Sequence, residues 1–183
     1  MNVSESQSKP NRLHLGAIFC IAAASLIGAY ALFYLARTTG VWGTTNNGEF
    51  VQPPLTVAEL VLVDARGAQP TAGPTWWLWL SAAERCDPAC RDALHQLRQL
   101  HVLLNKDAPR LRRVLVTGPD FRAQALLLDY PDMQHLEAAS GQLRDGIYIV
   151  DPIGNLVFYY PFTDAGKPVL DDLKQLLKVS QIG

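Results

Sequence analysis

The chain has 183 residues and a formal net charge of -1, so it has room for one domain of ordinary size and one additional segment. The near-neutral charge and the lack of a basic stripe argue against a nucleic-acid partner. Two of its 3 cysteines, Cys86 and Cys90, lie outside a long apolar N-terminal run.

The first segment of the chain is predicted to be a membrane anchor. Residues 1–12 are polar and are expected to form a disordered cytoplasmic tail. Residues 13–36 contain no Asp, Glu, Lys or Arg, and a helix of this length, at about 1.5 Å per residue, crosses a bilayer core of roughly 30 Å. A cleaved signal peptide is the alternative, but its cleavage site needs small residues, and this run ends in Leu32-Phe33-Tyr34-Leu35-Ala36. We therefore predict an uncleaved single-pass anchor.

The basic residues beside this run indicate its orientation. Lys9 and Arg12 precede it and Arg37 alone follows, so the N-terminus is predicted to be cytoplasmic. The larger part of the chain then lies outside. In a bacterium this means a domain on the periplasmic side of the inner membrane, where cysteine pairs can be oxidised. Residues 37–54 are expected to be a linker, and residues 55–183 the folded domain.

The domain alternates apolar runs with one clear helix start. The run Thr75–Ser81 is apolar throughout, which is typical of a strand buried on both faces. Asp87 is a good N-cap and Pro88 suits the first helical position. Asp171 and Asp172 are expected on the solvent side of the last helix. In chain order we expect a strand at 60–64, a strand at 75–81, a helix from 88 to about 104, a strand at 114–117, helical segments at 121–128 and 132–139, strands at 147–151 and 156–160, and a closing helix at 167–179.

This order predicts an α/β domain whose first half contains a parallel crossover and whose second half contains an antiparallel hairpin. The thioredoxin-like fold, a mixed sheet flanked by helices, has this order, and here it would carry one N-terminal transmembrane helix. The strand at 60–64 would be an N-terminal addition. That fold keeps its reactive site after the first core strand, which is where Cys86 and Cys90 stand.

The position of the two cysteines favours thiolate. Cys86 would lie just before a helix and Cys90 in its first turn, where unpaired N–H groups and the helix dipole stabilise negative charge. Arg85 and Arg91 would add to this effect, and Asp87 would oppose it. Such a pair, with both sulfurs facing solvent, can form a redox-active disulfide or hold Cu(I). The plainer alternative is a passive disulfide or two inert buried thiols.

The layout of the chain resembles the SCO/SenC family of membrane-anchored copper chaperones for cytochrome c oxidase assembly. The resemblance covers the anchor, the run Phe50–Pro54, the C-x-x-x-C of Cys86 and Cys90, and the run Ile147–Asn155, which is similar to the family's strand and D-P-x-G turn. It implies a thioredoxin-like fold and copper bound by both cysteines and a downstream histidine. It also implies delivery of copper to, or reduction of, the copper site of oxidase subunit II.

The sequence departs from the family pattern in two places. Arg91 stands where the family usually has proline. The histidine is expected a few residues before the strand at 147, but residues 141–146 contain none. Met133 and His135 are the nearest soft-metal-compatible side chains, and His135 is the candidate third metal ligand beside Cys86 and Cys90.

The sequence is consistent with three functions. The first is a thiol–disulfide reductase or copper chaperone for oxidase assembly, with Cys86 as nucleophile and Cys90 as resolving thiol. Thiol–disulfide exchange ranks above copper binding there, because it needs no histidine. The second is a non-catalytic docking factor in which the Cys86–Cys90 pair is structural. The third is a general periplasmic reductase with unrelated clients.

Overall fold

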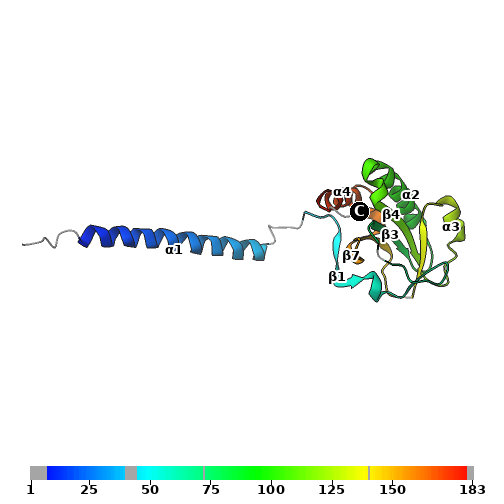
Figure 1. Cartoon of the computed structure of the whole chain (residues 1–183), viewed down its shortest axis with the longest axis horizontal. Coiled ribbons are helices and arrows are strands. Elements are labelled where there is room, and N and C mark those ends of the chain that lie inside the picture. Colours follow the sequence, from blue (N-terminus) through cyan, green and yellow to red (C-terminus); the bar gives the residue numbers. More distant parts are fainter. Residues whose placement is uncertain (1–7, 40–44, 72, 140, 181–183) are drawn as a thin grey trace, which may run out of the picture. The chain divides into compact units, whose positions relative to one another are not determined.

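The computed structural model describes residues 8–39, 45–71, 73–139 and 141–180, and the chain divides into two compact units, 1–45 and 46–183. The first unit is built on helix α1, Ser8–Thr39 (Figure 1). Its segment Arg12–Thr38, 27 residues, is long and apolar enough to cross a membrane, and a signal sequence can have the same length and composition. The helix therefore contains the predicted anchor and begins within the predicted tail, of which residues 1–7 lie outside the described residues.

Seven strands of the described chain form one sheet in the order β1-β7-β6-β3-β4-β5-β2. The central strand β3 lies parallel to β4 and antiparallel to β6, β5 continues parallel to β4, and β7 returns from β6 as a hairpin. The sheet is therefore mixed, as predicted. The strands are β1 (Glu49–Thr56), β2 (Leu62–Asp64), β3 (Trp76–Ala82), β4 (Leu111–Thr117), β5 (Gln134–Ala138), β6 (Gly146–Val150) and β7 (Asn155–Tyr160).

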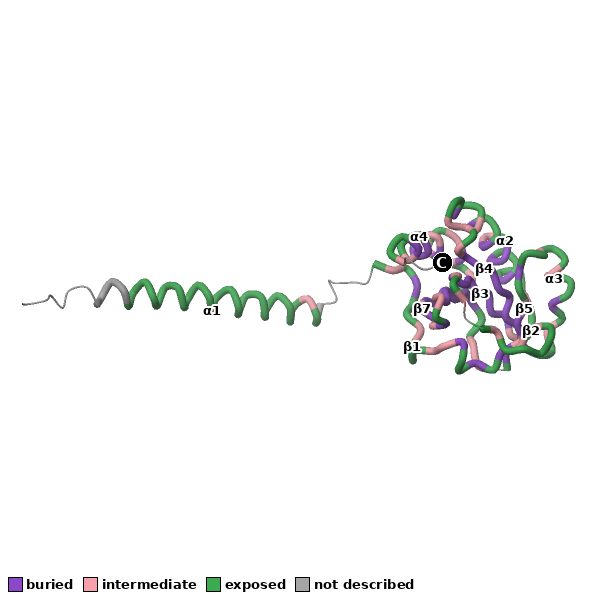
Figure 2. The backbone as a smooth tube through the Cα atoms, in the orientation of Figure 1, coloured by how far each residue is buried: buried purple, intermediate pink, exposed green. Residues whose placement is uncertain are grey.

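The helices of the domain are α2 (Pro88–Leu103), α3 (Gln124–Asp129) and α4 (Lys167–Val179), with short 3-10 helices η2 (Val57–Glu59), η3 (Asn105–Arg110) and η4 (Phe162–Asp164). Apolar residues of α2 and α4 share one core with one face of the sheet. The opposite face, which carries Trp77 and Trp79, packs with Val57 and Leu60 in a second core. Every residue of β3 is buried, so the central strand lies between the two cores, as its continuous apolar run predicts (Figure 2).

Two strands were not predicted. Residues 132–139, expected to be helical, contain β5, which pairs with β4 on one side and β2 on the other. Pairing on both sides outweighs the weak local preference of this short segment for helix. β1 occupies Glu49–Thr56, at the end of the predicted linker, and pairs with β7. Its two prolines are tolerated because β1 is an edge strand whose register shifts between Phe50 and Leu55.

The start of the domain is tied to α4 by a buried carboxylate. Asp172 is 2% exposed, which corrects the prediction that it faces solvent. It accepts hydrogen bonds from the backbone N–H of Asn47 at 2.7 Å, the backbone N–H of Gly48 at 2.9 Å and the hydroxyl of Tyr160 at 2.6 Å. Burial, together with the hydrogen bond to Asp172, raises the pKa of Tyr160, so its hydroxyl stays protonated and donates. The neighbouring Asp171 is exposed, as expected.

We predict that Asp172→Ala lowers the free energy of unfolding of the domain by about 3 kcal/mol, because it leaves a buried N–H and a buried hydroxyl without an acceptor. Asp171→Ala is the matched control. It removes only an exposed ion pair with Lys167 and should change stability by less than about 0.5 kcal/mol. Chemical denaturation of both variants measures the difference, and equal stabilities would contradict this role of Asp172.

Candidate redox site

The site forms where the buried strand β3 passes into helix α2. Asp87 is the N-cap of α2, and its side chain accepts a hydrogen bond from the backbone N–H of Cys90 at 2.8 Å. Pro88 occupies the first helical position, where its missing N–H costs nothing. Cys86 therefore lies just before the helix and Cys90 in its first turn, as predicted from the sequence.

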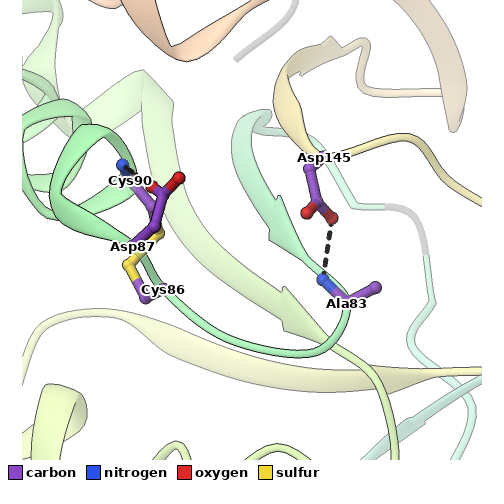
Figure 3. Close-up of a disulfide and its surroundings, with 5 residues drawn as sticks. All are labelled: Ala83, Cys86, Asp87, Cys90 and Asp145. Carbon is purple, nitrogen blue, oxygen red and sulfur yellow. Dashed lines mark hydrogen bonds between the residues drawn. A yellow bond between two sulfur atoms is a disulfide. The ribbon is translucent and has the colours of Figure 1, made fainter.

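The connection between β3 and the first cysteine is held from two sides. The backbone N–H of Ala83 donates to the carboxylate of Asp145 at 2.8 Å, as Figure 3 shows. The carbonyl of Ala83 accepts from the backbone N–H of Gly118 at 2.9 Å. Any larger residue at 118 would place a Cβ only 2.4 Å from that carbonyl oxygen, so this close approach requires glycine. These contacts fix the backbone three residues before Cys86.

Asp145 is a site residue that the sequence did not identify. It lies in the run 141–146, where the resemblance to the SCO/SenC family leads one to expect a histidine. Its carboxylate binds the backbone of Ala83 (Figure 3). At this position the chain therefore has a residue that positions the loop before Cys86.

Cys86 and Cys90 are joined by a disulfide, with their Cα atoms 5.1 Å apart. Cys86 is partly exposed, whereas Cys90 is 0% exposed and belongs to the core beneath α2. The expectation that both sulfurs face solvent is therefore wrong for Cys90. Because the first turn of α2 points one side chain inward, an attacking group from outside can reach Cys86 far more easily than Cys90.

The charges around the pair partly cancel. The N-terminus of a helix stabilises a nearby anion, typically by about 0.3–1 kcal/mol at an exposed position. Asp87 reduces this effect at Cys86, because its carboxylate is itself an anion and already accepts from one of the first N–H groups. The exposed side chains Arg85 and Arg91 act in the opposite direction, since both line the groove beside Cys86.

A groove of about 660 Å³ runs beside Cys86. One wall is the loop before α2, and the other is formed by the segment that contains α3, from Asp120 to Tyr130. Phe121, Leu126 and Tyr130 give it a partly buried apolar floor that packs against the core together with Cys86. Cys86 therefore lines a groove with an apolar floor, whereas Cys90 does not.

Among the described residues, His135 is not grouped with Cys86 and Cys90 into a three-ligand site. His135 lies on β5, and its Nε2 is 2.9 Å from the hydroxyl oxygen of Thr117. Burial lowers the pKa of His135. Met133 is buried in the core. In the part of the chain that the structure describes, no three His, Cys, Asp or Glu residues are grouped to hold a metal ion. The two cysteine sulfurs are bonded to each other, and a disulfide is a poor ligand for Cu(I).

The sheet and the position of the cysteine pair define a thioredoxin-like domain. A family model described as "Transmembrane-like, thioredoxin-like, C-terminal domain" matches residues 76–180, more than half of the chain, and the chain belongs to this family. No curated protein is similar enough to the sequence to count as a match.

The chain is similar to several solved structures, of which three are described. Yeast Sco1 is 18% identical with a TM-score of 0.50, over 65% of this chain and 95% of that chain. ScoI of Arabidopsis thaliana with copper bound is 13% identical with a TM-score of 0.48, over 70% and 98% of the two chains. The thioredoxin domain of a thiol-disulfide oxidoreductase from Bacteroides vulgatus is 13% identical with a TM-score of 0.49, over 73% and 99%. The likeness to yeast Sco1 confirms the resemblance to the Sco proteins at the level of the fold.

We predict that, after mild reduction of the full-length protein in detergent, iodoacetamide modifies Cys86 about tenfold faster than Cys90, because the Cys90 sulfur is enclosed. Peptide mass spectrometry distinguishes the two sites from each other and from Cys20. The control is the same reaction in denaturant, where the two rates should converge. Equal rates in the folded protein would contradict the asymmetry of the pair.

Proposed function

We propose that this protein is a membrane-anchored thiol–disulfide oxidoreductase that uses Cys86 as nucleophile and Cys90 as resolving thiol. The observation that carries the proposal is the asymmetric disulfide at the start of α2, in which Cys86 is partly exposed and Cys90 is fully buried. A disulfide that closes so short a loop stabilises a fold by only about 2 kcal/mol in the chain-entropy model, so stabilisation is a weak reason for its presence.

The exchange reaction begins with the reduced pair. The Cys86 thiolate attacks one sulfur of a client disulfide, which forms a mixed disulfide and releases the first client thiolate. The Cys90 thiolate then attacks the Cys86 sulfur, which restores the Cys86–Cys90 disulfide and releases the second client thiolate. Two electrons pass to the client, and its two thiolates take up protons from solvent. A dithiol reductant must then reduce the protein for the next cycle.

The proposed location follows from α1 and its flanking charges. A single-pass anchor with a cytoplasmic N-terminus holds the domain on the outer side of a bacterial inner membrane, where disulfides form. The resemblance to the SCO/SenC family supports a client among the copper-site cysteines of cytochrome c oxidase subunit II. Such cysteines must be reduced before they can bind copper, which is a task that needs no metal ligand on this chain.

The central test is capture of the client. Without a resolving thiol the mixed disulfide cannot be released, so Cys90→Ser in the full-length protein should accumulate a covalent complex in membranes. Non-reducing gel electrophoresis and mass spectrometry would detect and identify it. Cys86→Ser is the matched control and should trap nothing.

The alternative, a docking factor with a structural disulfide, predicts a different result. Neither variant would then trap a client, and the double variant Cys86→Ser/Cys90→Ser would support client assembly as well as the unaltered protein. That pair of results would overturn the proposed activity.

Copper binding is the second activity that the resemblance suggests. Without a histidine beside them, the two cysteines would be its only ligands at this site. We predict that Cu(I) bound by the reduced full-length protein depends on both cysteines, and that His135→Ala leaves the affinity within about twofold, since His135 binds Thr117. Competition with a chromogenic Cu(I) chelator measures both. A loss of about tenfold or more in His135→Ala would show that this histidine is a ligand.

A further inference from the structure

A second polar site lies away from the disulfide, on the same side of the sheet as α2. Arg113 is the third residue of β4 and pairs in register with Leu78, at the opposite end of β3 from the cysteines. His101 is on the last turns of α2. Both side chains line a groove of about 390 Å³, which Pro109, Arg112 and Gln134 also border. The site is therefore separate from the groove beside Cys86.

Arg113 is an unusual residue to find in this position. Its side chain is 7% exposed, and a buried guanidinium is costly unless its donors and its charge are satisfied. The nearest anion is Asp132, whose carboxylate oxygen is 3.7 Å from Nη2, beyond normal hydrogen-bond distance. Asp132 is itself 86% exposed, so solvent weakens the attraction.

Two buried nitrogen atoms of this site have no hydrogen-bond partner among the described residues: Nη1 of Arg113 and Nδ1 of His101. Three other buried side-chain atoms, on Thr75, Trp76 and Trp79, also have no hydrogen-bond partner among the described residues, but those side chains are neutral. A water molecule would satisfy a neutral donor. It would not balance the charge of a guanidinium, which a bound anion does.

The electrostatic surroundings favour an anion. Burial, followed by repulsion from Arg98, lowers the pKa of Arg113, but arginine remains charged at neutral pH. Burial and the charge of Arg113 lower the pKa of His101, so its ring is neutral and has one N–H to donate. Arg98, Arg112 and Arg113 together outweigh the single carboxylate of Asp132.

We propose that the groove between the end of α2 and the start of β4 is a binding site for a small oxyanion, of the carboxylate or phosphate class. Nη1 of Arg113 and the ring N–H of His101 would hold its oxygen atoms, and Arg98 would add attraction from the surface. The site is independent of the cysteine chemistry.

The test is a titration of the full-length protein in detergent, with isotope-labelled histidine, against inorganic phosphate in one series and acetate in another. The pH is held at 7.5 and the ionic strength is kept constant. The side-chain resonances of His101 should shift saturably in at least one series, while those of the exposed His95 should not. The two series distinguish a phosphate site from a carboxylate site.

Three variants decide the role of the arginines. Arg113→Gln should weaken binding by about tenfold or more, since a charge-assisted hydrogen bond is lost. Arg98→Gln changes an exposed residue, preserves the fold and should weaken binding about threefold. Arg122→Gln, in the groove beside Cys86, removes an equal charge elsewhere and should have no effect. A His101 shift that is absent, does not saturate, or is equal in Arg98→Gln and Arg122→Gln overturns the proposal.

Discussion

The turn from β3 into α2 sets what the two sulfurs can do. β3 is buried along its whole length, so the chain leaves the core at a fixed point and enters the helix within a few residues. Asp87 caps the helix, and Ala83 is held by Asp145 on one side and Gly118 on the other. Along this held connection Cys86 and Cys90 lie within bonding distance of each other.

The same turn makes the two cysteines unequal. Cys86, just before the helix, is partly exposed, whereas Cys90, the third residue of α2, is directed into the core that α2 shares with the sheet. The exposure of Cys86 and the enclosure of Cys90 follow from this geometry. In the proposed exchange reaction the partly exposed Cys86 would attack the client, and the buried Cys90 would be protected from outside reagents until it attacked Cys86.

The elements nearest the cysteines could be predicted because their signals are local. An apolar run, an N-cap and a proline at the first helical position suffice to place β3 and the start of α2. Closing helix α4, Lys167–Val179, was also predicted at its observed bounds because its apolar residues repeat with a clear helical period.

What the sequence did not reveal depends on partners distant in the chain. β5 is a strand because it pairs with β4 on one side and β2 on the other, and β1 is a strand because it pairs with β7. Asp172 is buried because backbone N–H groups more than a hundred residues earlier reach its carboxylate. The roles of Asp145 and Arg113 likewise depend on tertiary contacts, which the residues next to them in the sequence do not predict.

The most direct test of the account is whether the Cys86–Cys90 disulfide exchanges reversibly in the folded protein. The full-length protein in detergent would be equilibrated with glutathione buffers of graded composition, and the oxidised fraction determined by alkylation and mass spectrometry. The account predicts a reversible two-electron transition of this pair, with an unchanged circular dichroism spectrum. A disulfide that opens only after the domain is unfolded would contradict it.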